Sequence, residues 1–270
     1  MTAPFSYDGK RVIVTGAASG MGRATVAMLD QLGAEVHALD IAPCDGPATK
    51  AHETDCGDPS SIDATLDSIG APLHCLFNVA GVPQTHPPER VIGVNFLGLR
   101  HLTERVLDGM MSEGGAIANV ASKAGSGWAN HLPAIQELLA TPDLAAGVAW
   151  ASANLAEQGD PYFFSKECVV VYTLQRSHDL LDRGIRMNSL SPGPIDSPMM
   201  PQFREALGSG LLDWSAAQVG RMGRAEEMAG PLVFLNSDEA SYVNGLDLFA
   251  DGGFTAAMSL GNVDLTTLPA

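Results

Sequence analysis

The sequence is poor in basic residues and contains no long apolar run. Its 15 lysines and arginines stand against 31 acidic residues, which gives a formal net charge of −16. A nucleic acid or an anionic membrane surface would repel such a chain, so we expect neither kind of partner. No apolar stretch approaches the roughly 20 residues that span a bilayer, and we expect no signal peptide from the first residues.

Cysteine and histidine are also scarce, and they form no pattern typical of disulfides or metal sites. The four cysteines are scattered and include no Cys-x-x-Cys pair, which favours reduced thiols and a cytoplasmic location. The seven histidines show no ligand-like spacing, so we expect no protein-bound catalytic metal. These two patterns therefore predict neither a disulfide framework nor a metal centre.

What the sequence does contain is an alternation of strand-like and helix-like segments. The length of 270 residues and the apolar fraction of 46% suit one domain with a large core, without a linker or repeat. A strand is predicted over 11–15, followed by a helix over 22–32. Further strands are predicted over 35–40, 73–79, 115–120, 186–191 and 246–250. The alternation predicts an α/β fold, a doubly wound parallel sheet with helices on both faces.

Three glycines follow the first predicted strand, in the segment Thr15-Gly16-Ala17-Ala18-Ser19-Gly20-Met21-Gly22. Glycine allows a sharp turn and lets a pyrophosphate approach the start of the next helix, where free N–H groups favour an anion. The spacing Gly-x-x-x-Gly-x-Gly differs from the Gly-x-Gly-x-x-Gly of other dinucleotide-binding folds. A glycine-rich turn without a ligand is the alternative, but the flanking strand and helix favour a nucleotide site.

Asp40 ends the second predicted strand, 18 residues beyond Gly22. A carboxylate at this point can accept hydrogen bonds from both hydroxyls of the adenosine ribose, and it would repel the 2′-phosphate of NADP. No basic residue follows it directly, because the next residues are Ile41, Ala42 and Pro43. We therefore predict NAD(H) as the cofactor, with an exposed loop aspartate as the alternative.

Tyr162 and Lys166 stand four residues apart, so on a helix both side chains share one face. A nearby ammonium favours the phenolate, so we expect Lys166 to lower the Tyr162 pKa from its usual value of about 10. A tyrosine tuned in this way can exchange a proton with an alcohol or a ketone. Such pairs also arise by chance, but here a nucleotide site, Asn95 and Ser122 precede the pair in a compatible order.

These motifs resemble the short-chain dehydrogenase/reductase family over roughly residues 9–256. The branch of bacterial 3α-hydroxysteroid dehydrogenase/carbonyl reductase is the most similar in pattern. The resemblance implies a single Rossmann domain over 1–270 and a homo-oligomer, either a dimer or a tetramer. It also implies that the catalytic residues are Asn95, Ser122, Tyr162 and Lys166.

The same resemblance implies a row of cofactor contacts. Asp55 and Cys56 match the position that reaches adenine, and Val79 replaces the second asparagine of an Asn-Asn-Ala-Gly motif. Ser197 stands where the family has a threonine, and its hydroxyl keeps the hydrogen bond to the nicotinamide amide. The implied cofactor set is Thr15, Gly16, Ser19, Gly20, Met21, Gly22, Asp40, Asp55, Cys56, Asn78, Ala80, Gly81, Tyr162, Lys166, Pro192, Gly193, Ile195 and Ser197.

The family mechanism gives each catalytic residue a role. Tyr162 would be the general acid/base, Lys166 would lower its pKa and hold the nicotinamide ribose, and Ser122 would fix the substrate oxygen. Asn95 would hold a water in a proton relay. The chain would thus interconvert a secondary alcohol and a ketone with NAD. The alternatives are a carbonyl reductase of broad specificity, a non-catalytic NAD-binding protein, and an epimerase or dehydratase, whose glycine spacing differs from that seen here.

An insertion separates Ser122 from Tyr162, because these residues stand 40 apart and most relatives have about 27 fewer residues between them. It covers about 128–158 and contains two predicted helices, over 133–140 and 143–155, with Asp143 near the start of the second. We expect it at the mouth of the active site or against a partner subunit. The branch suggests a hydroxysteroid or another bulky alicyclic alcohol as substrate.

Two apolar surfaces complete the prediction. The loop 197–203, continuing to 211–214, is rich in methionine and aromatic residues and suits an adaptable lid over a bulky ligand. Methionines that only pack a helix are the alternative. The helix that starts at Tyr162 offers a second apolar face for a subunit contact, formed by Val169, Val170, Val171 and Leu174.

Overall fold

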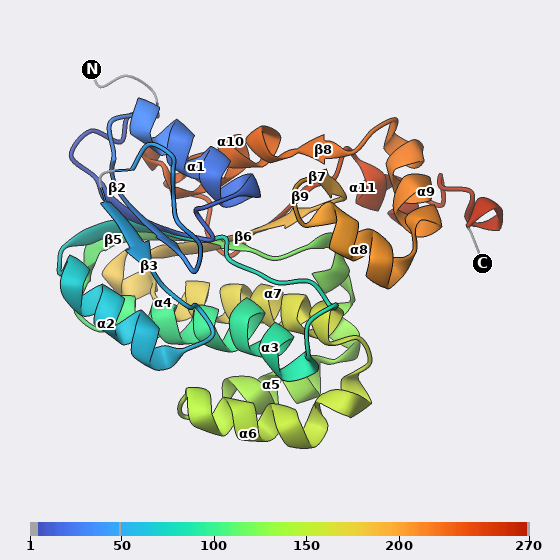
Figure 1. Cartoon of the computed structure of the whole chain (residues 1–270), viewed down its shortest axis with the longest axis horizontal. Helices are drawn as coiled ribbons and strands as arrows, with labels where there is room; N and C mark the ends of the chain where they lie inside the picture. The colour runs from blue at the N-terminus through green and yellow to red at the C-terminus, as the bar shows by residue number, and fades with distance from the viewer. Residues whose placement is uncertain (1–4, 49, 269–270) are drawn as a thin grey trace.

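Seven parallel strands form the central sheet of the protein, whose computed structural model describes residues 5–48 and 50–268 (Figure 1). Their order is β3-β2-β1-β4-β5-β6-β9, so the winding reverses between β1 and β4. The strands are β1 Arg11–Thr15, β2 Glu35–Asp40, β3 Lys50–Glu53, β4 Leu73–Asn78, β5 Met111–Val120, β6 Arg186–Pro192 and β9 Asp247–Ala250. A separate pair is formed by β7 Ile195–Asp196 and β8 Gly223–Arg224.

Helices cover both faces of this sheet (Figure 1). One face carries α1 Gly20–Gln31 and α10 Ala225–Asn236, and the other carries α2 Pro59–Ile69, α4 Leu99–Leu107 and α7 Pro161–Asp179. The remaining helical elements are α3 Pro88–Ile92, η1 Gly93–Gly98, η2 Lys123–Asn130, α5 Leu132–Leu139, α6 Leu144–Asn154, η3 Leu155–Gln158, η4 Leu181–Arg183, α8 Met200–Leu207, α9 Ser209–Val219, η5 Asp238–Ala240, α11 Phe254–Ser259 and η6 Leu265–Thr267. The predicted single-domain, doubly wound Rossmann fold is confirmed.

Alternate residues of the central strands pack into the two halves of the core, which lie on opposite faces of the sheet. In β1, Val12 and Val14 pack with α1 and α10, whereas Ile13 packs with the helices of the opposite face. Successive side chains of a strand point to opposite faces, so a strand covered on both sides is apolar throughout. The continuous apolar runs in the sequence are a direct consequence.

The predicted strands are confirmed, with small shifts at their ends. The strand expected over 115–120 begins at Met111, and the helix expected from Gly22 begins at Gly20. The edge strand β3 has no counterpart among the strands predicted from the sequence. Its residues Lys50–Glu53 are mostly exposed, so neither an apolar run nor an alternation marks them.

The helices of the insertion are also confirmed, and they form a layer outside α7, at the bottom of Figure 1. Both lie within one residue of their predicted bounds. Asp143 caps α6, because its Oδ1 accepts a hydrogen bond from the backbone N of Ala146 at 2.8 Å. The insertion adds to the core shared with α7 through Ile135, Leu138, Ala151 and Leu155.

A buried arginine ties the insertion to the rest of the chain. Arg100 of α4 is 8% exposed, and its Nη1 donates to the carbonyl of Leu138 at 3.0 Å. Its Nη2 donates to Oγ1 of Thr141 at 3.0 Å and to the carbonyl of Asp143 at 3.1 Å. Carbonyls at the end of a helix lack partners within the helix, so the guanidinium caps α5 and joins it to α6.

The apolar residues that we expected to offer a subunit contact on α7 pack inside the chain instead. Val169, Val170 and Val171 are 0%, 1% and 6% exposed, and Leu174 is partly buried against the same core. The sequence marked these residues as an apolar face but did not identify what α7 packs against, which includes η1 and α5. The expectation of a subunit contact was therefore wrong, because the four side chains already pack against the core of their own chain.

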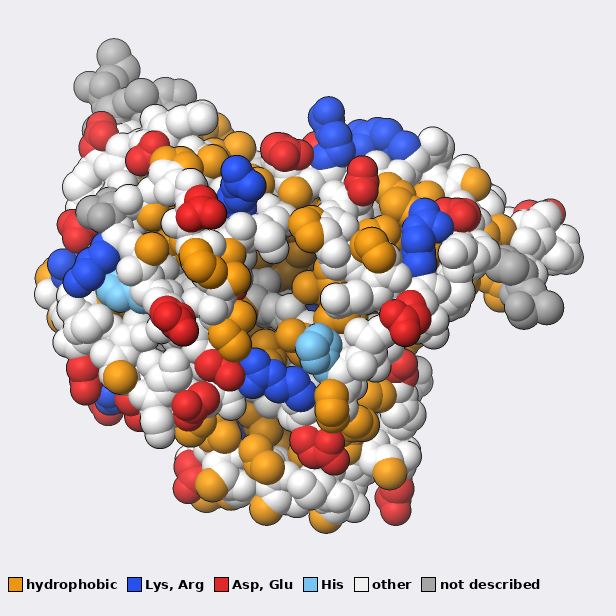
Figure 2. Space-filling model, viewed as in Figure 1, with side chains coloured by type: hydrophobic (Ala, Val, Ile, Leu, Met, Phe, Trp, Pro, Cys, Tyr) orange, Lys and Arg blue, Asp and Glu red, His pale blue; other side chains and the backbone are white. Residues whose placement is uncertain are grey.

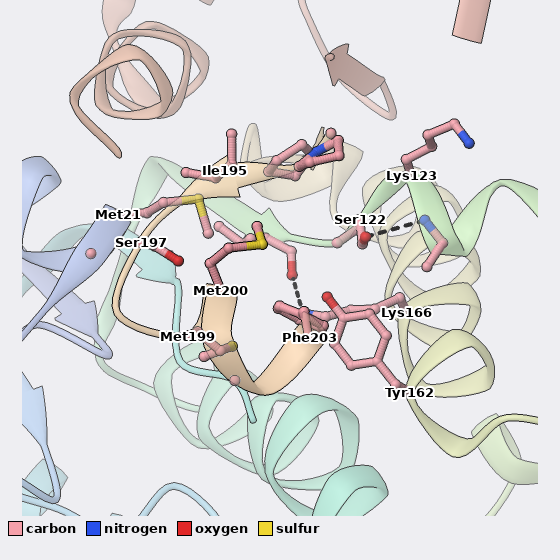
Figure 3. Close-up of a pocket in the computed structure, with 18 of the residues that line it drawn as sticks. Met21, Ser122, Lys123, Tyr162, Lys166, Ile195, Ser197, Met199, Met200 and Phe203 are labelled. Carbon is pink, nitrogen blue, oxygen red and sulfur yellow. Dashed lines mark hydrogen bonds between the residues drawn. The ribbon is translucent and has the colours of Figure 1, made fainter. Parts of the chain in front are cut away.

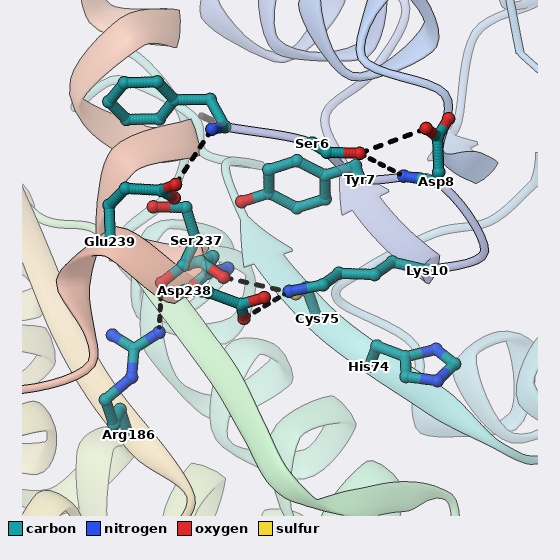
Figure 4. A network of polar contacts seen from close by, with 12 residues as sticks. Ser6, Tyr7, Asp8, Lys10, His74, Cys75, Arg186, Ser237, Asp238 and Glu239 are labelled. Carbon is teal, nitrogen blue, oxygen red and sulfur yellow. Dashed lines mark hydrogen bonds and ion pairs between the residues drawn. The ribbon is translucent and has the colours of Figure 1, made fainter. Parts of the chain in front are cut away.

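Polar contacts fix the start of the described chain against the end of α10 (Figure 4). Tyr7 is fully buried and donates its hydroxyl to the carbonyl of Val233 at 2.7 Å. Lys10 forms an ion pair with Asp238. Arg186 donates to the carbonyl of Ser237 at 2.8 Å. These contacts hold the residues before β1 and the start of β6 to the end of α10 and the turn that follows it.

We expect Arg100→Met to lower the free energy of unfolding by about 2–4 kcal/mol. Methionine keeps the apolar stem but leaves the acceptors of the insertion without donors. Urea unfolding followed by circular dichroism measures the change. Arg23→Met, at an exposed position of α1, is the control. A loss no larger than that of the control would contradict this role of Arg100.

Candidate active site

A cavity of about 650 Å³ opens at the carboxyl ends of the strands, where the winding of the sheet reverses. Figure 2 shows a hollow in the middle of this face, with hydrophobic side chains on its walls. The segments after β1, β4, β5 and β6 line it, together with α8 and α9. Ligands of open α/β sheets bind at this kind of crevice.

The turn between β1 and α1 forms one end of the cavity. An added Cβ at Gly16 would lie 2.8 Å from Cα of Ala80, and one at Gly22 would lie 2.0 Å from the carbonyl oxygen of Gly16. Both positions therefore require glycine. Gly20 differs, because the nearest atom to its added Cβ is Cβ of Ser197 at 3.9 Å. The N-cap residue of α1 makes no side-chain cap bond and no acid stands in the first turn.

This glycine cradle fits the diphosphate of a dinucleotide. The first N–H groups of α1 have no partners within the helix, and the helix dipole favours an anion at this end. Gly20 has φ +51° and leaves open the space that a side chain would fill. The donors and the space that a diphosphate needs are therefore both present.

Asp40 lines the same end of the cavity, at the tip of β2. Its Oδ2 accepts a hydrogen bond from the backbone N of Ala18 at 3.0 Å, and its Oδ1 accepts one from the backbone N of Ala42 at 2.9 Å. These bonds orient the carboxylate, and each oxygen keeps a lone pair for another donor. Within residues 5–48 and 50–268, no basic side chain forms an ion pair with Asp40.

Ser122, Tyr162 and Lys166 meet on the opposite wall (Figure 3). Ser122 ends the segment after β5 and caps η2 by accepting from the backbone N of Ala124 at 3.1 Å. Lys166 is 4% exposed, donates from Nζ to the carbonyl of Val120 at 2.8 Å, and lies 5.9 Å from the centroid of the Tyr162 ring. The start of α7 thus presents the phenol and the ammonium to one space.

Burial dominates the protonation of this pair. Desolvation raises the pKa of Tyr162 to about 12, although a hydrogen bond with Ser122 lowers it. Desolvation also lowers the pKa of Lys166 to about 8. The expectation that Lys166 lowers the tyrosine pKa is wrong for this structure, because the same poorly hydrated wall penalises both the phenolate and the ammonium.

Asn95 lies behind the catalytic wall, in the π-helical turn η1. Its Oδ1 accepts from the backbone N of Val82 at 2.7 Å, while Nδ2 donates to the carbonyl of Val82 at 3.0 Å and to Oγ of Ser165 at 3.2 Å. Such turns within helices often mark functional sites. An added Cβ at Gly81 would lie 3.2 Å from Oδ1 of Asn95 and 3.6 Å from Nζ of Lys166, so these groups converge on Gly81.

Thr15 and Asn78 belong to the predicted cofactor set but do not line the cavity. Oγ1 of Thr15 accepts from the backbone N of both Val79 and Ala80 at 3.0 Å, which holds the segment after β4 against the cradle. Asn78 donates from Nδ2 to Oδ1 of Asn119 at 2.8 Å. Both side chains therefore shape the wall from behind.

Asp55 and Cys56 also lie outside the lining of the cavity. The Asp55 carboxylate forms a two-point pair with Arg90, at 3.0 Å and 2.9 Å. Cys56 is 9% exposed, and its carbonyl packs so closely on Gly98 that no Cβ fits there. A contact of either residue with adenine stays a prediction.

The remaining predicted cofactor residues do line the cavity. They include Ser19 and Met21 beside the cradle and Ile195 after β6. The complete group is Gly16, Ser19, Gly20, Met21, Gly22, Asp40, Ala80, Gly81, Tyr162, Lys166, Pro192, Gly193, Ile195 and Ser197. Segments far apart in the sequence thus form one continuous surface.

The predicted lid closes the other end of the cavity. Phe203 of α8 packs edge-on against the Tyr162 ring, with centroids 5.1 Å apart, and Met199 and Met200 lie beside it (Figure 3). Trp214 of α9 continues this apolar wall and donates Nε1 to Oγ1 of Thr267 at 2.8 Å. The apolar character of the lid suits a ligand with a hydrocarbon ring.

The insertion takes no part in this lining. No described residue between 128 and 158 lines the cavity, so the first of its two expected places, at the mouth of the active site, is wrong. The second, against a partner subunit, stays a prediction. Its nearest link is His131, whose Nδ1 lies 2.7 Å from Oε2 of Glu167 on the cavity wall. Burial raises the pKa of Glu167, and the histidine opposes this effect.

Three lining residues with distinct chemistry were not predicted from the sequence. They are Lys123, Glu167 and Phe254. Lys123 and Glu167 each directly follow a predicted catalytic residue, which was the only available signal. Phe254 comes from the C-terminal part of the chain, and no motif marks it.

Among residues 5–48 and 50–268, no helix combines the length and apolar character that a membrane span requires. The same residues contain no group of three or more histidine, cysteine or acidic side chains placed to hold a metal ion.

Comparison with known proteins agrees with this arrangement. A sequence model described as short chain dehydrogenase matches residues 10–134, and one described as enoyl-(acyl carrier protein) reductase matches residues 144–255. The coniferyl-alcohol dehydrogenase of a Pseudomonas species is 32% identical over 248 residues, which cover 92% of this chain and 97% of that protein. The chain belongs to the short-chain dehydrogenase family.

Two further members of the family are similar over almost the whole chain. The cyclohexanol dehydrogenase of an Acinetobacter species is 29% identical over 275 residues and covers 93% of this chain and 96% of its own. The crystal structure of the 3-alpha-hydroxysteroid dehydrogenase from Pseudomonas sp. B-0831, complexed with NADH, gives a TM-score of 0.79 at 28% identity. The match covers 93% of this chain and 99% of that chain. The predicted resemblance to the hydroxysteroid dehydrogenase branch is confirmed.

We expect Tyr162 to stay protonated in the cofactor-free protein until about pH 11, because burial raises its pKa to about 12. The absorbance of tyrosinate at 295 nm, in wild type minus Tyr162→Phe, isolates this residue. The difference should be flat from pH 7 to about pH 11. An inflection near pH 9 would show that the lysine, and not burial, controls the phenol.

Proposed function

We propose that this protein is an NAD-dependent dehydrogenase that interconverts a secondary alcohol of a bulky ring and the corresponding ketone. One observation carries the proposal: Ser122, Tyr162 and Lys166 share a wall of one cavity with the glycine cradle and Asp40. Membership of an oxidoreductase family supports the reaction class. The arrangement is consistent with a reacting carbon that lies between the cofactor end and the apolar lid.

Tyr162 is the proposed general acid/base, because its hydroxyl is the titratable donor on the wall that faces the lid. In reduction it gives its proton to the substrate oxygen, and in oxidation it accepts one. Ser122 orients that oxygen by a second hydrogen bond. The bound nicotinamide would supply the hydride chemistry itself.

Lys166 and Asn95 have supporting roles in this proposal. The buried ammonium of Lys166 stabilises negative charge that develops on the phenol, and it is free to donate to the cofactor ribose with its remaining hydrogens. Asn95 holds the segment after β4 in place through Val82. Its carbonyl oxygen keeps one lone pair for a relay water.

NAD is the proposed cofactor because of Asp40. Its carboxylate already holds two backbone N–H groups and presents its remaining lone pairs to the cavity. These suit the ribose hydroxyls, whereas a 2′-phosphate would meet a fixed negative charge. The similar 3-alpha-hydroxysteroid dehydrogenase was crystallised as a complex with NADH, which supports the same choice.

The substrate class follows from the lid and from the relatives. Met199, Met200, Phe203 and Trp214 give the cavity an adaptable apolar wall. The cyclohexanol and 3-alpha-hydroxysteroid dehydrogenases act, by their names, on alcohols of rings. A hydroxysteroid or a smaller alicyclic alcohol fits both observations.

A carbonyl reductase is the second candidate, and the raised pKa of Tyr162 favours it. A tyrosine that is protonated at neutral pH is ready to donate a proton to a ketone oxygen. The substrate is a small molecule in both cases. Assembly as a dimer or tetramer and a cytoplasmic location stay predictions.

The first test is the formation of NADH at 340 nm with cyclohexanol, cyclopentanol and 3α-, 3β- and 17β-hydroxysteroids. We expect turnover with at least one ring alcohol and a loss of at least about 1000-fold in kcat for Tyr162→Phe, because phenylalanine cannot exchange a proton with the substrate oxygen. NADH binding by the variant should persist. Most of the activity surviving in Tyr162→Phe would rule out the assigned acid/base, and NADH binding without any turnover would favour a non-catalytic protein.

Asp40→Ala tests the cofactor assignment separately. We expect the KM for NAD to rise about tenfold, since the ribose loses charge-assisted hydrogen bonds. The ratio of kcat/KM for NAD to kcat/KM for NADP should fall by a similar factor. Kinetics with both cofactors are the measurement. Unchanged KM values for both cofactors would show that Asp40 does not bind the cofactor.

A further inference from the structure

The cavity holds a lysine that the proposed reaction does not use. The sequence contains only four lysines, Lys10, Lys50, Lys123 and Lys166. Two of them, Lys123 and Lys166, line the same cavity. Lys166 belongs to the proposed catalytic set, and Lys10 is paired with Asp238. Lys123 therefore remains as a cation at a ligand site without an assigned role.

Lys123 lies between the catalytic serine and the far end of the lid. It directly follows Ser122 and begins η2. Its Nζ lies 4.2 Å from the centroid of the Phe254 ring. That ring packs edge-on against Trp214, with centroids 5.8 Å apart. All four side chains line the cavity, so the ammonium stands on an aromatic wall.

Among the described residues, no acid neutralises this ammonium at close range. In the described ranges, Lys123 forms no ion pair and donates no hydrogen bond to another side chain or to the backbone. Asp251 is near enough to act on it electrostatically, but its two oxygens accept from the backbone N of Gly253 and Thr255. Glu167, the other acid of this wall, is paired with His131.

Leaving the Lys123 ammonium unpaired in this partly desolvated place costs free energy, and an anionic ligand could offset that cost. Desolvation lowers the pKa of Lys123, and only Asp251 opposes this effect. A cation that is partly removed from water is stabilised by an anion or by several hydrogen bonds. The aromatic contact with Phe254 supplies part of this stabilisation, and a carboxylate could accept hydrogen bonds from the three donors of the ammonium.

The cofactor does not supply the missing anion. Its diphosphate fits the glycine cradle at the start of α1, and Asp40 marks the adenosine end of the same side. In Figure 3, Met21 of the cradle and Lys123 lie on opposite sides of the pocket. An anion that pairs with Lys123 would then belong to the molecule that occupies the lid end of the cavity.

We propose that Lys123 binds a carboxylate of the substrate, so that the natural substrate is a ring alcohol that also carries a carboxylate group. The apolar wall of Phe254 and Trp214 would hold the ring, and Ser122 would hold the alcohol oxygen. The alcohol part of this inference rests on the proposed function. The carboxylate site does not, because it depends only on the contacts of Lys123.

A binding experiment tests the site without any turnover. Calorimetry on the full chain with saturating NADH compares cyclohexanecarboxylate with cyclohexanecarboxamide, which has the same ring and no charge. We expect the carboxylate to bind about tenfold tighter or more, as for a charge-assisted hydrogen bond. Lys123→Met should abolish that preference, and Lys123→Arg should retain it.

Lys50→Met is the matched control, because Lys50 is exposed on the edge strand β3 and lies outside the cavity. It should leave the preference for the carboxylate unchanged. Equal affinity for acid and amide in the wild type, no detectable binding of either, or a preference that survives Lys123→Met would each overturn the site. Thermal melts of the variants establish that they are folded.

A turnover experiment separates this inference from the proposed function. It compares kcat/KM for 4-hydroxycyclohexanecarboxylate with that for its methyl ester, in the wild type and in Lys123→Met. We expect the ratio of acid to ester to fall at least about tenfold in the variant. A constant ratio overturns the role of Lys123 while the dehydrogenase activity stands. Carboxylate binding without oxidation of any ring alcohol keeps the site and rejects the proposed reaction.

Discussion

The candidate active site depends on a series of hydrogen bonds that runs from the end of β1 to α7. Thr15 accepts two backbone N–H groups of the segment 79–82, which fixes that segment against the glycine cradle. The same segment exchanges two hydrogen bonds with Asn95, and Asn95 donates to Ser165, the neighbour of Lys166. The glycine cradle and α7 are thus joined by one connected set of polar contacts, most of them to backbone groups.

Much of the fold could be predicted because local rules agree with tertiary structure. Strands buried on both faces are apolar runs, and a capping aspartate such as Asp143 marks the start of a helix. The edge strand β3 escaped prediction because exposed residues carry no such pattern. The place of the insertion could not be predicted either. It depends on Arg100, whose partners lie 38 to 43 residues away in the sequence, and periodicity gives no information about distant partners.

The candidate site, like the fold, could be predicted from the sequence only in part. Motif residues around the cradle and on α7 do meet at one cavity, because the carboxyl ends of parallel strands share one edge of the sheet. The protonation of Tyr162 could not be predicted from its spacing to Lys166. Spacing gives proximity, whereas the pKa also depends on how much water the walls exclude, and here desolvation is the largest cause of the shift in both residues.

Trp214 gives the cavity an intrinsic optical probe. Of the three tryptophans, it alone lines the cavity, while Trp128 and Trp150 pack with the insertion and its surroundings. Its indole is held by Thr267 and by the edge of Phe254, so its emission reports on the lid and the C-terminal turn together. Fluorescence of this single residue, with the other two replaced by phenylalanine, therefore follows occupation of the substrate end without any attached label.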